Sequence, residues 1–292
     1  MRRWLAIVNP AAGLARANRR LVRRLACEWG EHFEILHTAC PGDAARLARE
    51  AAGYEGLLAV GGDGTIAEVL GGMDLPRQSL ALLPAGHGNC LARDLGIGSP
   101  QLAFDALGRE CTTLLDLMRV CIEFRDGRHE ERLAASTVAL GYVAEVVALG
   151  RRRFAGLGGL AYTAAALLTC VQRRELRLGA GGTLAPRRLT NLVINNTAHL
   201  ANFRAFHDAR LDDGRLDVLE AAYSWGRQML HNAAILAGSR RFGPAALWQA
   251  PVVAIESALP ARLMVDGEVL EEVSRVTLEC LPGVLRWRGA VG

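Results

Sequence analysis

LLAVGGDGTIAEVL, residues 57–70, decides how the N-terminal part of this chain folds. Its first four residues form a short apolar run that ends at glycine, which is typical of a buried strand, and residues 66–70 contain no helix breaker. The glycines therefore fill a strand-to-helix turn. Glycine allows a sharp turn and close packing of the helix on the sheet, but this structural interpretation leaves Asp63 unexplained.

The same turn also has a functional interpretation. Exposed backbone N–H groups and the positive end of the following helix form a cradle for a phosphate group. Asp63 would then hold the accompanying metal ion, and Thr65 would add a hydroxyl. A glycine-rich turn by itself leaves both interpretations open.

Strands and helices alternate through the first hundred residues. Apolar runs predict strands at residues 5–8, 33–37, 57–60 and 80–83, with helices over about 16–29 and 43–52, from 66, and from about 90. Such alternation implies a parallel sheet covered by helices on both faces. Ligands bind outside the carboxyl ends of such strands, and four polar residues each follow a predicted strand: Asn9, Thr38, Asp63 and His87.

The pattern changes after about residue 115. Short runs separated by Gly, Asp and Pro predict strands at residues 119–124, 133–140, 189–195, 216–221, 252–256 and 275–280, with helices around 155–173 and 225–237. We therefore expect an α/β domain over residues 1–117 and a β-rich domain over residues 118–292, whose last residues can pack back on the first domain.

The composition restricts the partners of the chain. All 34 basic residues are arginine, so the lysine of a P-loop is missing and a nucleotide must be held by backbone, arginine and metal. The net charge of +4 is modest and does not indicate a nucleic-acid partner. The seven cysteines include no C-x-x-C pair, which disfavours disulfides and structural zinc and fits a reducing cytoplasm.

An uncharged segment, FAGLGGLAYTAAALLTCV at residues 154–171, approaches the length of a membrane span. Its three glycines and five alanines make it only weakly hydrophobic, which favours a buried or membrane-facing helix. Arg151–Arg153 precede it and are candidates for contact with anionic lipid. The arginines between residues 16 and 24 more often form a solvated helix face.

An ordered set of motifs extends along the chain from residue 5 to about residue 285. It consists of Asn9-Pro10, GGDGT at 61–65 with Glu68, Pro84-x-Gly-x-Gly-Asn89, Asp213-Gly214 and Asp266-Gly267-Glu268. In this order the motifs resemble the diacylglycerol kinase catalytic family, which includes bacterial lipid kinases and sphingosine kinases. The GGDGT motif alone is shared with NAD kinases.

The resemblance implies an α/β nucleotide-binding domain with a parallel sheet, a C-terminal β-sandwich domain that carries the lipid acceptor, and a cleft between them. The implied activity is transfer of the γ-phosphoryl group of ATP, with Mg²⁺, to a hydroxyl of a diacylglycerol-like or sphingoid lipid. The resemblance also implies a homodimer in the cytoplasm, bound peripherally to the inner face of the membrane.

Roles for individual residues follow from the same resemblance. Positions matching the nucleotide-binding motifs are Asn9, Thr38, Gly61, Gly62, Gly64, Thr65, Glu68, His87 and Asn89. Asp63 would serve the catalytic magnesium, and Asp266 would be the general base, with Glu268 close to the metal or phosphates. A structural magnesium would be held by the Asp213 carboxylate and the carbonyls of Arg210 and Arg215.

Two of these carboxylates also have structural interpretations. Asp266-Gly267 between apolar runs is a hairpin signal, which spacing alone favours. Asp213-Gly214 fits a tight turn without a metal. As a base, Asp266 would accept the proton of the attacking alcohol, a contribution of about 10²–10⁴-fold.

Several positions depart from the family pattern, namely Ala67, His87, Cys90 and Asn202–Arg204. Three hypotheses are therefore retained: a lipid kinase, a soluble-substrate kinase related to NAD kinases, and a nucleotide-binding protein without turnover. The NAD kinase hypothesis expects an Asn-Glu pair after the GGDGT region, and the chain contains no such pair.

Overall fold

The structure, a computed structural model, describes residues 4–13, 15–86, 88–109, 111–154, 161–169, 172–180, 183–200, 203–222, 224–236 and 246–289. The chain divides into two compact units. The first comprises Met1–Leu117 with Pro282–Gly292, and the second comprises Met118–Leu281.

A parallel sheet forms the centre of the first unit. Its strands run in the order β4-β3-β1-β2 and are β1 (Trp4–Val8), β2 (Phe33–His37), β3 (Gly56–Gly61) and β4 (Ser79–Pro84). Every residue of β1 and β3 is buried, as expected of parallel strands covered on both faces. The end of β16 (Glu268–Arg288) adds a parallel strand beside β4 through Arg286 and Trp287.

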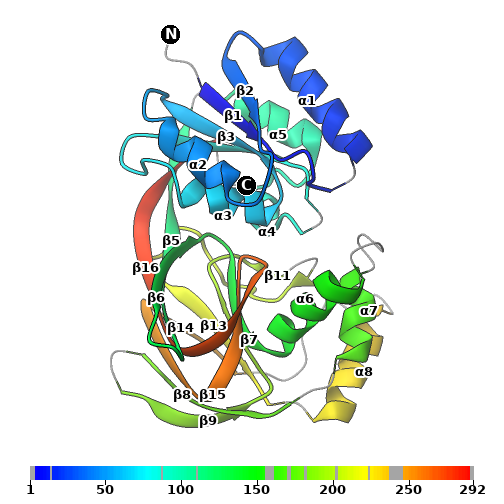
Figure 1. Cartoon of the computed structure of the whole chain (residues 1–292), viewed down its shortest axis with the longest axis vertical. Coiled ribbons are helices and arrows are strands. Elements are labelled where there is room, and N and C mark those ends of the chain that lie inside the picture. The colour runs from blue at the N-terminus through cyan, green and yellow to red at the C-terminus, as the bar shows by residue number, and fades with distance from the viewer. Residues whose placement is uncertain are drawn as a thin grey trace. The chain divides into compact units, whose positions relative to one another are not determined.

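Helices cover both faces of this sheet. They are α1 (Ala15–Trp29), α2 (Asp43–Glu50), α3 (Asp63–Leu70), α4 (Cys90–Asp94) and α5 (Pro100–Leu107). Figure 1 shows α1 and α5 on one face and α2 and α3 on the other. The sequence interpretation missed α5, although the Ser99 side chain accepts a hydrogen bond from Leu102 N and Pro100 opens the helix, a standard start signal.

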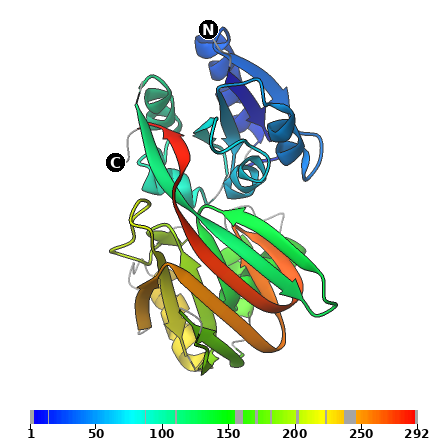
Figure 2. The same ribbon diagram turned by 90° about the vertical axis from the view of Figure 1, so that its left-hand side faces the viewer.

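The second unit is mostly antiparallel. Its strands are the part of β5 (Thr112–Phe124) from Met118 onward, β6 (His129–Ala134), β7 (Thr137–Gly141), β8 (Arg174–Gly179), β9 (Ala185–Leu189), β10 (Asn191–Asn195), β11 (His199–Leu200), β12 (Phe203–Arg204), β13 (Leu216–Ala221), β14 (Ala246–Ala250), β15 (Val252–Val265) and most of β16. The order β14-β13-β10-β7-β15-β16 forms the main path of the sheet. The long strands β5 and β16 pair with each other and run side by side in Figure 2.

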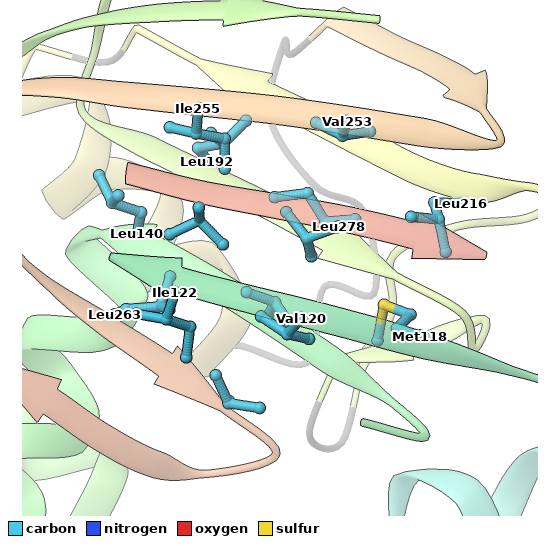
Figure 3. Packing of buried hydrophobic residues seen from close by; sticks show 14 of the residues in the cluster. Met118, Val120, Ile122, Leu140, Leu192, Leu216, Val253, Ile255, Leu263 and Leu278 are labelled. Atoms are coloured by element: carbon cyan, nitrogen blue, oxygen red, sulfur yellow. The ribbon is translucent and has the colours of Figure 1, made fainter. Parts of the chain in front are cut away.

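Alternating apolar residues build the main core of this unit. Met118, Val120 and Ile122 of β5 stand two residues apart, so their side chains share one face of the strand, and all three are buried. Figure 3 shows them facing apolar side chains of other strands, among them Leu263 and Leu278. This packing supplies the hydrophobic free energy that holds the strands together.

Three helices of the second unit are described: α6 (Tyr142–Arg153), α7 (Ala161–Leu168) and α8 (Trp225–Leu236). A smaller core contains Ala144 of α6 with Ala139, Val193 and Met264 of the sheet. No helix in the described ranges is long and apolar enough to cross a bilayer.

The predicted fold class is confirmed, because a parallel α/β region is followed by a mostly antiparallel β part. Two strand predictions within it are wrong, and one helix prediction is confirmed over only part of its range. Residues 133–140 form two strands separated by a turn at Ala135-Ser136, and residues 189–195 are interrupted at Thr190. In the region predicted as a helix over residues 155–173, α7 ends at Leu168 and residues 172–173 are not helical, while 155–160 and 170–171 lie outside the described residues.

Candidate nucleotide and metal sites

Asn9 ties the end of β1 to the GGDGT turn in the first unit. Its backbone N–H donates to the Val60 carbonyl at 2.9 Å, and its Nδ2 donates to Thr65 Oγ1 at 3.0 Å. Thr38 follows β2, and its N–H donates to the Val8 carbonyl at 2.9 Å. Because the four strands are parallel, their carboxyl ends meet at one edge of the sheet, so these predicted nucleotide-binding residues share that edge.

Two glycines of the GGDGT turn are required by close packing. A Cβ on Gly61 would lie 2.4 Å from Thr65 Oγ1, and a Cβ on Gly62 would lie 3.0 Å from the Gly86 Cα. The fold does not require a glycine at position 64, since nothing lies within 4 Å of a Cβ added there and the φ of Gly64 is not positive. The fold therefore leaves the backbone of Gly64 open to a ligand.

Asp63 joins the GGDGT turn to the turn of the Pro84-x-Gly-x-Gly-Asn89 motif, called the second glycine-rich turn below. It is the first residue of α3, and its Oδ1 accepts a hydrogen bond from the Cys90 N–H, at the start of α4, at 2.9 Å. Burial raises the pKa of the Asp63 carboxyl, and backbone N–H groups at Cys90 and Asn89 partly offset this by favouring the ionised form. Cys90 makes this contact through its backbone, so its departure from the family pattern keeps the bond.

Asn89 shapes the second glycine-rich turn. It adopts a left-handed conformation with φ 50°, and its side chain both accepts from Gly86 N at 3.1 Å and donates to Gly86 O at 2.9 Å. Glu68 lies on α3, and its Oε2 accepts from Ala44 N at 3.2 Å, in the first turn of α2. These bonds are structural, and nucleotide contacts by Asn89 and Glu68 stay predictions. His87 lies outside the described residues.

In the second unit, Asp266 and Gly267 form the tip of the hairpin between β15 and β16. Their φ angles are 43° and 87°, and Val265 pairs with Glu268 across the turn. Two successive positive φ angles are typical of a type I′ turn, for which Asp-Gly is a preferred sequence. The hairpin interpretation of this motif is therefore correct, whatever its chemical role.

The Asp266 carboxylate binds the turn between β6 and β7. Its Oδ1 accepts from Ser136 N at 3.0 Å and Thr137 N at 2.8 Å, and its Oδ2 accepts from Ala135 N at 2.8 Å. The residue is only 5% exposed. These three bonds use most of the four or so lone-pair positions of a carboxylate. Asp266 thus has a structural role, and its role as general base stays a prediction.

Glu268 is exposed and ion-paired. Its Oε2 accepts from a guanidinium nitrogen of Arg132 at 2.7 Å, and Arg132 also pairs with Glu130. The structure therefore places Glu268 at the first position of β16, where it pairs with the Arg132 guanidinium. Its contact with metal or phosphate stays a prediction.

The loop before β13 contains the residues predicted to hold a structural magnesium. Asp213 Oδ1 accepts from Arg215 N at 3.0 Å, which closes a tight turn, and the Arg210 guanidinium pairs with Asp212 at 3.0 Å. No group of three or more His, Cys, Asp or Glu side chains suited to a metal occurs in the described part of the chain. The carbonyls of Arg210 and Arg215 would have to complete such a site.

Asp217, two residues after Arg215, carries a signal that the sequence interpretation missed. It is 7% exposed, its Oδ1 accepts from Gln249 Nε2 at 2.9 Å, and its Oδ2 is buried without a hydrogen-bond partner. Burial raises the pKa of Asp217 to about 6, and the negative charges of Asp213 and Asp208 act in the same direction. A cation beside this loop would relieve that cost.

Asp217 belongs to a row of buried polar side chains at paired positions on the neighbouring strands β13, β10 and β7. Asp217 pairs in register with Asn195, and Asn195 pairs with Thr137, whose carbonyl accepts from Asp266 N at 2.8 Å. Asn195 Oδ1 and Thr137 Oγ1 are buried without partners, like Asp217 Oδ2. Unsatisfied oxygens in a native core are unusual and call for bound water or an ion. The available sequence signal was a polar residue at or next to the end of each apolar run: Thr137 begins β7, Asn195 ends β10, and Asp217 is the second residue of β13.

Comparisons with known proteins agree with these observations. The family model of the diacylglycerol kinase catalytic domain matches residues 3–120. A Pseudomonas aeruginosa protein described as "Probable lipid kinase YegS-like" is 31% identical over 274 residues, which cover 89% of this chain and 85% of that protein. A Bacillus subtilis protein described as "Diacylglycerol kinase" is 38% identical over 104 residues, or 33% of this chain and 34% of that protein.

The fold is also similar to a solved structure. A crystal structure of a diacylglycerol kinase from Bacillus anthracis has a TM-score of 0.76 with 23% identity, and the match covers 99% of this chain and 97% of that one. The likeness extends through both units. The chain therefore belongs to the diacylglycerol kinase catalytic domain family, whose members are lipid kinases that use ATP.

Proposed function

We propose that this protein transfers the γ-phosphoryl group of ATP to a hydroxyl of a diacylglycerol-like or sphingoid lipid. The observation that carries the proposal is the GGDGT turn. There Asp63 is joined to the second glycine-rich turn, while nothing in the fold requires the glycine at position 64. Membership of a lipid kinase family supports the reaction class.

The start of α3 suits a phosphate group. Its cap residue Gly62 has no side chain that could accept from the first N–H groups of the helix, and helix N-termini attract anions. In a chain without lysine, backbone N–H groups and arginine must supply the positive potential. The open backbone at Gly64 lets a phosphate approach closely.

Asp63 fits a catalytic magnesium ion. Carboxylate oxygen is a preferred ligand of Mg²⁺, and a nearby cation favours the ionised form that burial opposes. When bound, the ion would neutralise charge on the phosphoryl oxygens during transfer. Asp63 would keep the ion next to the second glycine-rich turn through its bond to Cys90 N.

Gly64→Ala separates ligand binding from folding. We expect the variant to be as stable as the wild type or slightly more stable, because alanine fits the open space and favours a helix by about 0.5–1 kcal/mol. Nucleotide affinity should fall at least tenfold, because the methyl group occupies the approach of the phosphates. Thermal unfolding and ATP titration measure the two effects.

Gly53→Ala is the matched control, since nothing lies within 4 Å of its added Cβ either. It should leave nucleotide affinity unchanged. Unchanged affinity in Gly64→Ala as well would contradict a phosphate site at this turn.

Asp213 and Asp217 supply carboxylate oxygens suited to a second cation. The buried Asp217 Oδ2, which has no hydrogen-bond partner in the described structure, supports this site. We expect millimolar Mg²⁺ to raise the thermal unfolding midpoint of the wild type, since a ligand at ten times its Kd stabilises by about 1.4 kcal/mol. Asp213→Asn should lose this response. Asp105→Asn, which changes an exposed carboxylate, is the control and should keep the response to Mg²⁺. An equal response in Asp213→Asn would remove this metal site.

The reaction itself is tested with purified protein, labelled ATP and a panel of diacylglycerol, sphingosine and NAD. We expect label on a lipid and none on NAD. Mass spectrometry of lipid retained on the purified protein identifies the acceptor independently. Nucleotide binding without label on any lipid would instead support the non-catalytic hypothesis.

A further inference from the structure

The buried face of α1 in the first unit carries a polar side chain. Asn18 is 3% exposed and shares the i, i+3 and i+7 spacing of one helix face with Leu21 and Leu25, which are also buried. Apolar packing on the sheet accounts for the two leucines. It does not account for an amide, because asparagine disfavours the interior of a helix and a buried amide needs hydrogen-bond partners.

Asn18 binds the turn that leads from β1 into α1, residues 9–13, which is called the Asn9 turn below. Its Nδ2 donates to the Asn9 carbonyl at 2.7 Å and to the Ala12 carbonyl at 3.2 Å. Both partners are acceptors, so the donor half of the amide must face them. Asn18 therefore holds the Asn9 turn against α1 by two bonds that an apolar side chain could not make.

The Asn9 turn also contacts both glycine-rich turns. The Asn9 side chain donates to Thr65 Oγ1 at 3.0 Å. Gly13 has a φ of 60°, and a Cβ added to it would lie 1.9 Å from the Ala85 carbonyl oxygen, so its backbone packs directly on the second glycine-rich turn. Packing this close leaves little room for adjustment, so the position of the Asn9 turn affects both glycine-rich turns.

We propose that Asn18 is a positioning residue for nucleotide binding. It does not contact the nucleotide, because its side chain is buried and the two N–H groups of its amide serve backbone carbonyls. It acts through Asn9, which bonds Thr65 of the proposed phosphate site. A site whose backbone is fixed before the ligand arrives loses less conformational entropy on binding. The inference rests on the proposed function, since it assigns Asn18 to the ATP site of that function.

The same unit contains a close structural match for Asn18. Gln78 is 1% exposed, and its Nε2 donates to the Ala51 carbonyl at 2.7 Å and to the Tyr54 carbonyl at 3.3 Å. It directly precedes β4, so it lies at the amino end of a parallel strand, away from the carboxyl edge that carries the predicted nucleotide-binding residues. Asn18 and Gln78 thus make equivalent bonds to backbone segments at opposite edges of the sheet.

The test replaces each amide by the carboxylate of the same shape. Asn18→Asp and Gln78→Glu both remove the donors and place a carboxylate against two carbonyls, so the thermal unfolding midpoint should fall by similar amounts in the two variants. Titration with ATP and Mg²⁺, at a temperature where both variants are folded, should separate them. We expect the nucleotide affinity of Asn18→Asp to fall about tenfold and that of Gln78→Glu to equal the wild-type value.

The kinase assay provides a readout that a loss of folded protein would not change. In Asn18→Asp the KM for ATP should rise together with the dissociation constant of ATP, while the KM for the lipid should stay at the wild-type value. A smaller folded fraction would instead lower kcat and leave both KM values unchanged.

Asn18→Ser tests the same contact without a buried charge. Its single O–H can serve only one of the two carbonyls, so it should bind ATP about threefold more weakly than the wild type. This variant decides the result if Asn18→Asp does not fold.

Two results would overturn the inference alone. One is wild-type affinity for ATP in the folded Asn18 variants. The other is an equal loss of ATP affinity in Gln78→Glu, which would show that damage to any buried amide of this unit loosens the site. A wild type that binds no ATP would overturn the proposed function and this inference together. A wild type that binds ATP but labels no lipid would contradict only the kinase reaction, because the titration needs no turnover.

Discussion

Asp63→Asn is expected to lower the rate of phosphoryl transfer about 10³-fold while leaving the fold intact. Asparagine keeps an oxygen that can accept from the Cys90 N–H, which donates to Asp63 Oδ1 at 2.9 Å in the wild type. The hydrogen bond between the two glycine-rich turns is therefore retained. It loses the negative charge that would hold magnesium. Steady-state turnover with labelled ATP measures the rate, and thermal unfolding measures the stability.

Two comparisons sharpen this experiment. Asp63→Ala also removes the acceptor for Cys90 N, so it should cost about 1 kcal/mol of stability in addition. Asp105→Asn changes an exposed carboxylate of α5 in the same unit and should leave both quantities unchanged. Turnover in Asp63→Asn within a few-fold of the wild type would show that this carboxylate does not serve the metal.

Asp266→Asn is expected to lower the free energy of unfolding by about 3–5 kcal/mol, independently of any effect on catalysis. The carboxylate accepts three backbone N–H groups while only 5% exposed. The amide of asparagine would point its own N–H donors at some of these donors, leaving buried groups unpaired. Urea unfolding followed by circular dichroism measures the loss.

The chain offers a matched control for Asp266. Asp126-Gly127 is another Asp-Gly turn, in which the exposed Asp126 accepts from Arg128 N, and Asp126→Asn should change stability by less than about 1 kcal/mol. The pair of measurements also separates the two roles of Asp266. An Asp266→Asn protein of wild-type stability without turnover would contradict the structural account and favour the general-base role.

Local patterns in the sequence were sufficient for much of the first unit. The predicted strands at residues 5–8, 33–37 and 80–83 correspond to β1, β2 and β4, because short apolar runs bounded by turn residues identify buried parallel strands. The GGDGT motif was correctly placed between a strand and a helix. The helix α6 was missed, because its sequence Tyr142–Arg153 continues an apolar run that also suits a strand.

The second unit shows where local patterns fail. The run at residues 133–140 alternates like one strand, yet it turns at Ala135-Ser136, where the chain is held by a carboxylate more than a hundred residues away in sequence. No periodicity in the run itself carries that information. The interruption at Thr190 is of the same kind, since Thr190 N donates to Ala221 O at 2.8 Å.

The sequence by itself determined the alternating elements of the parallel sheet, the positions of its polar strand ends and, through the order of its motifs, the family. Each of these depends on residues close in sequence or on motif order. Only the tertiary structure decided that Gly64 is free of packing, that Asp266 binds a distant turn, and that Thr137, Asn195 and Asp217 form one buried row. The physical reason is register: these contacts arise when strands from remote parts of the chain pair at a particular offset, which no local pattern encodes.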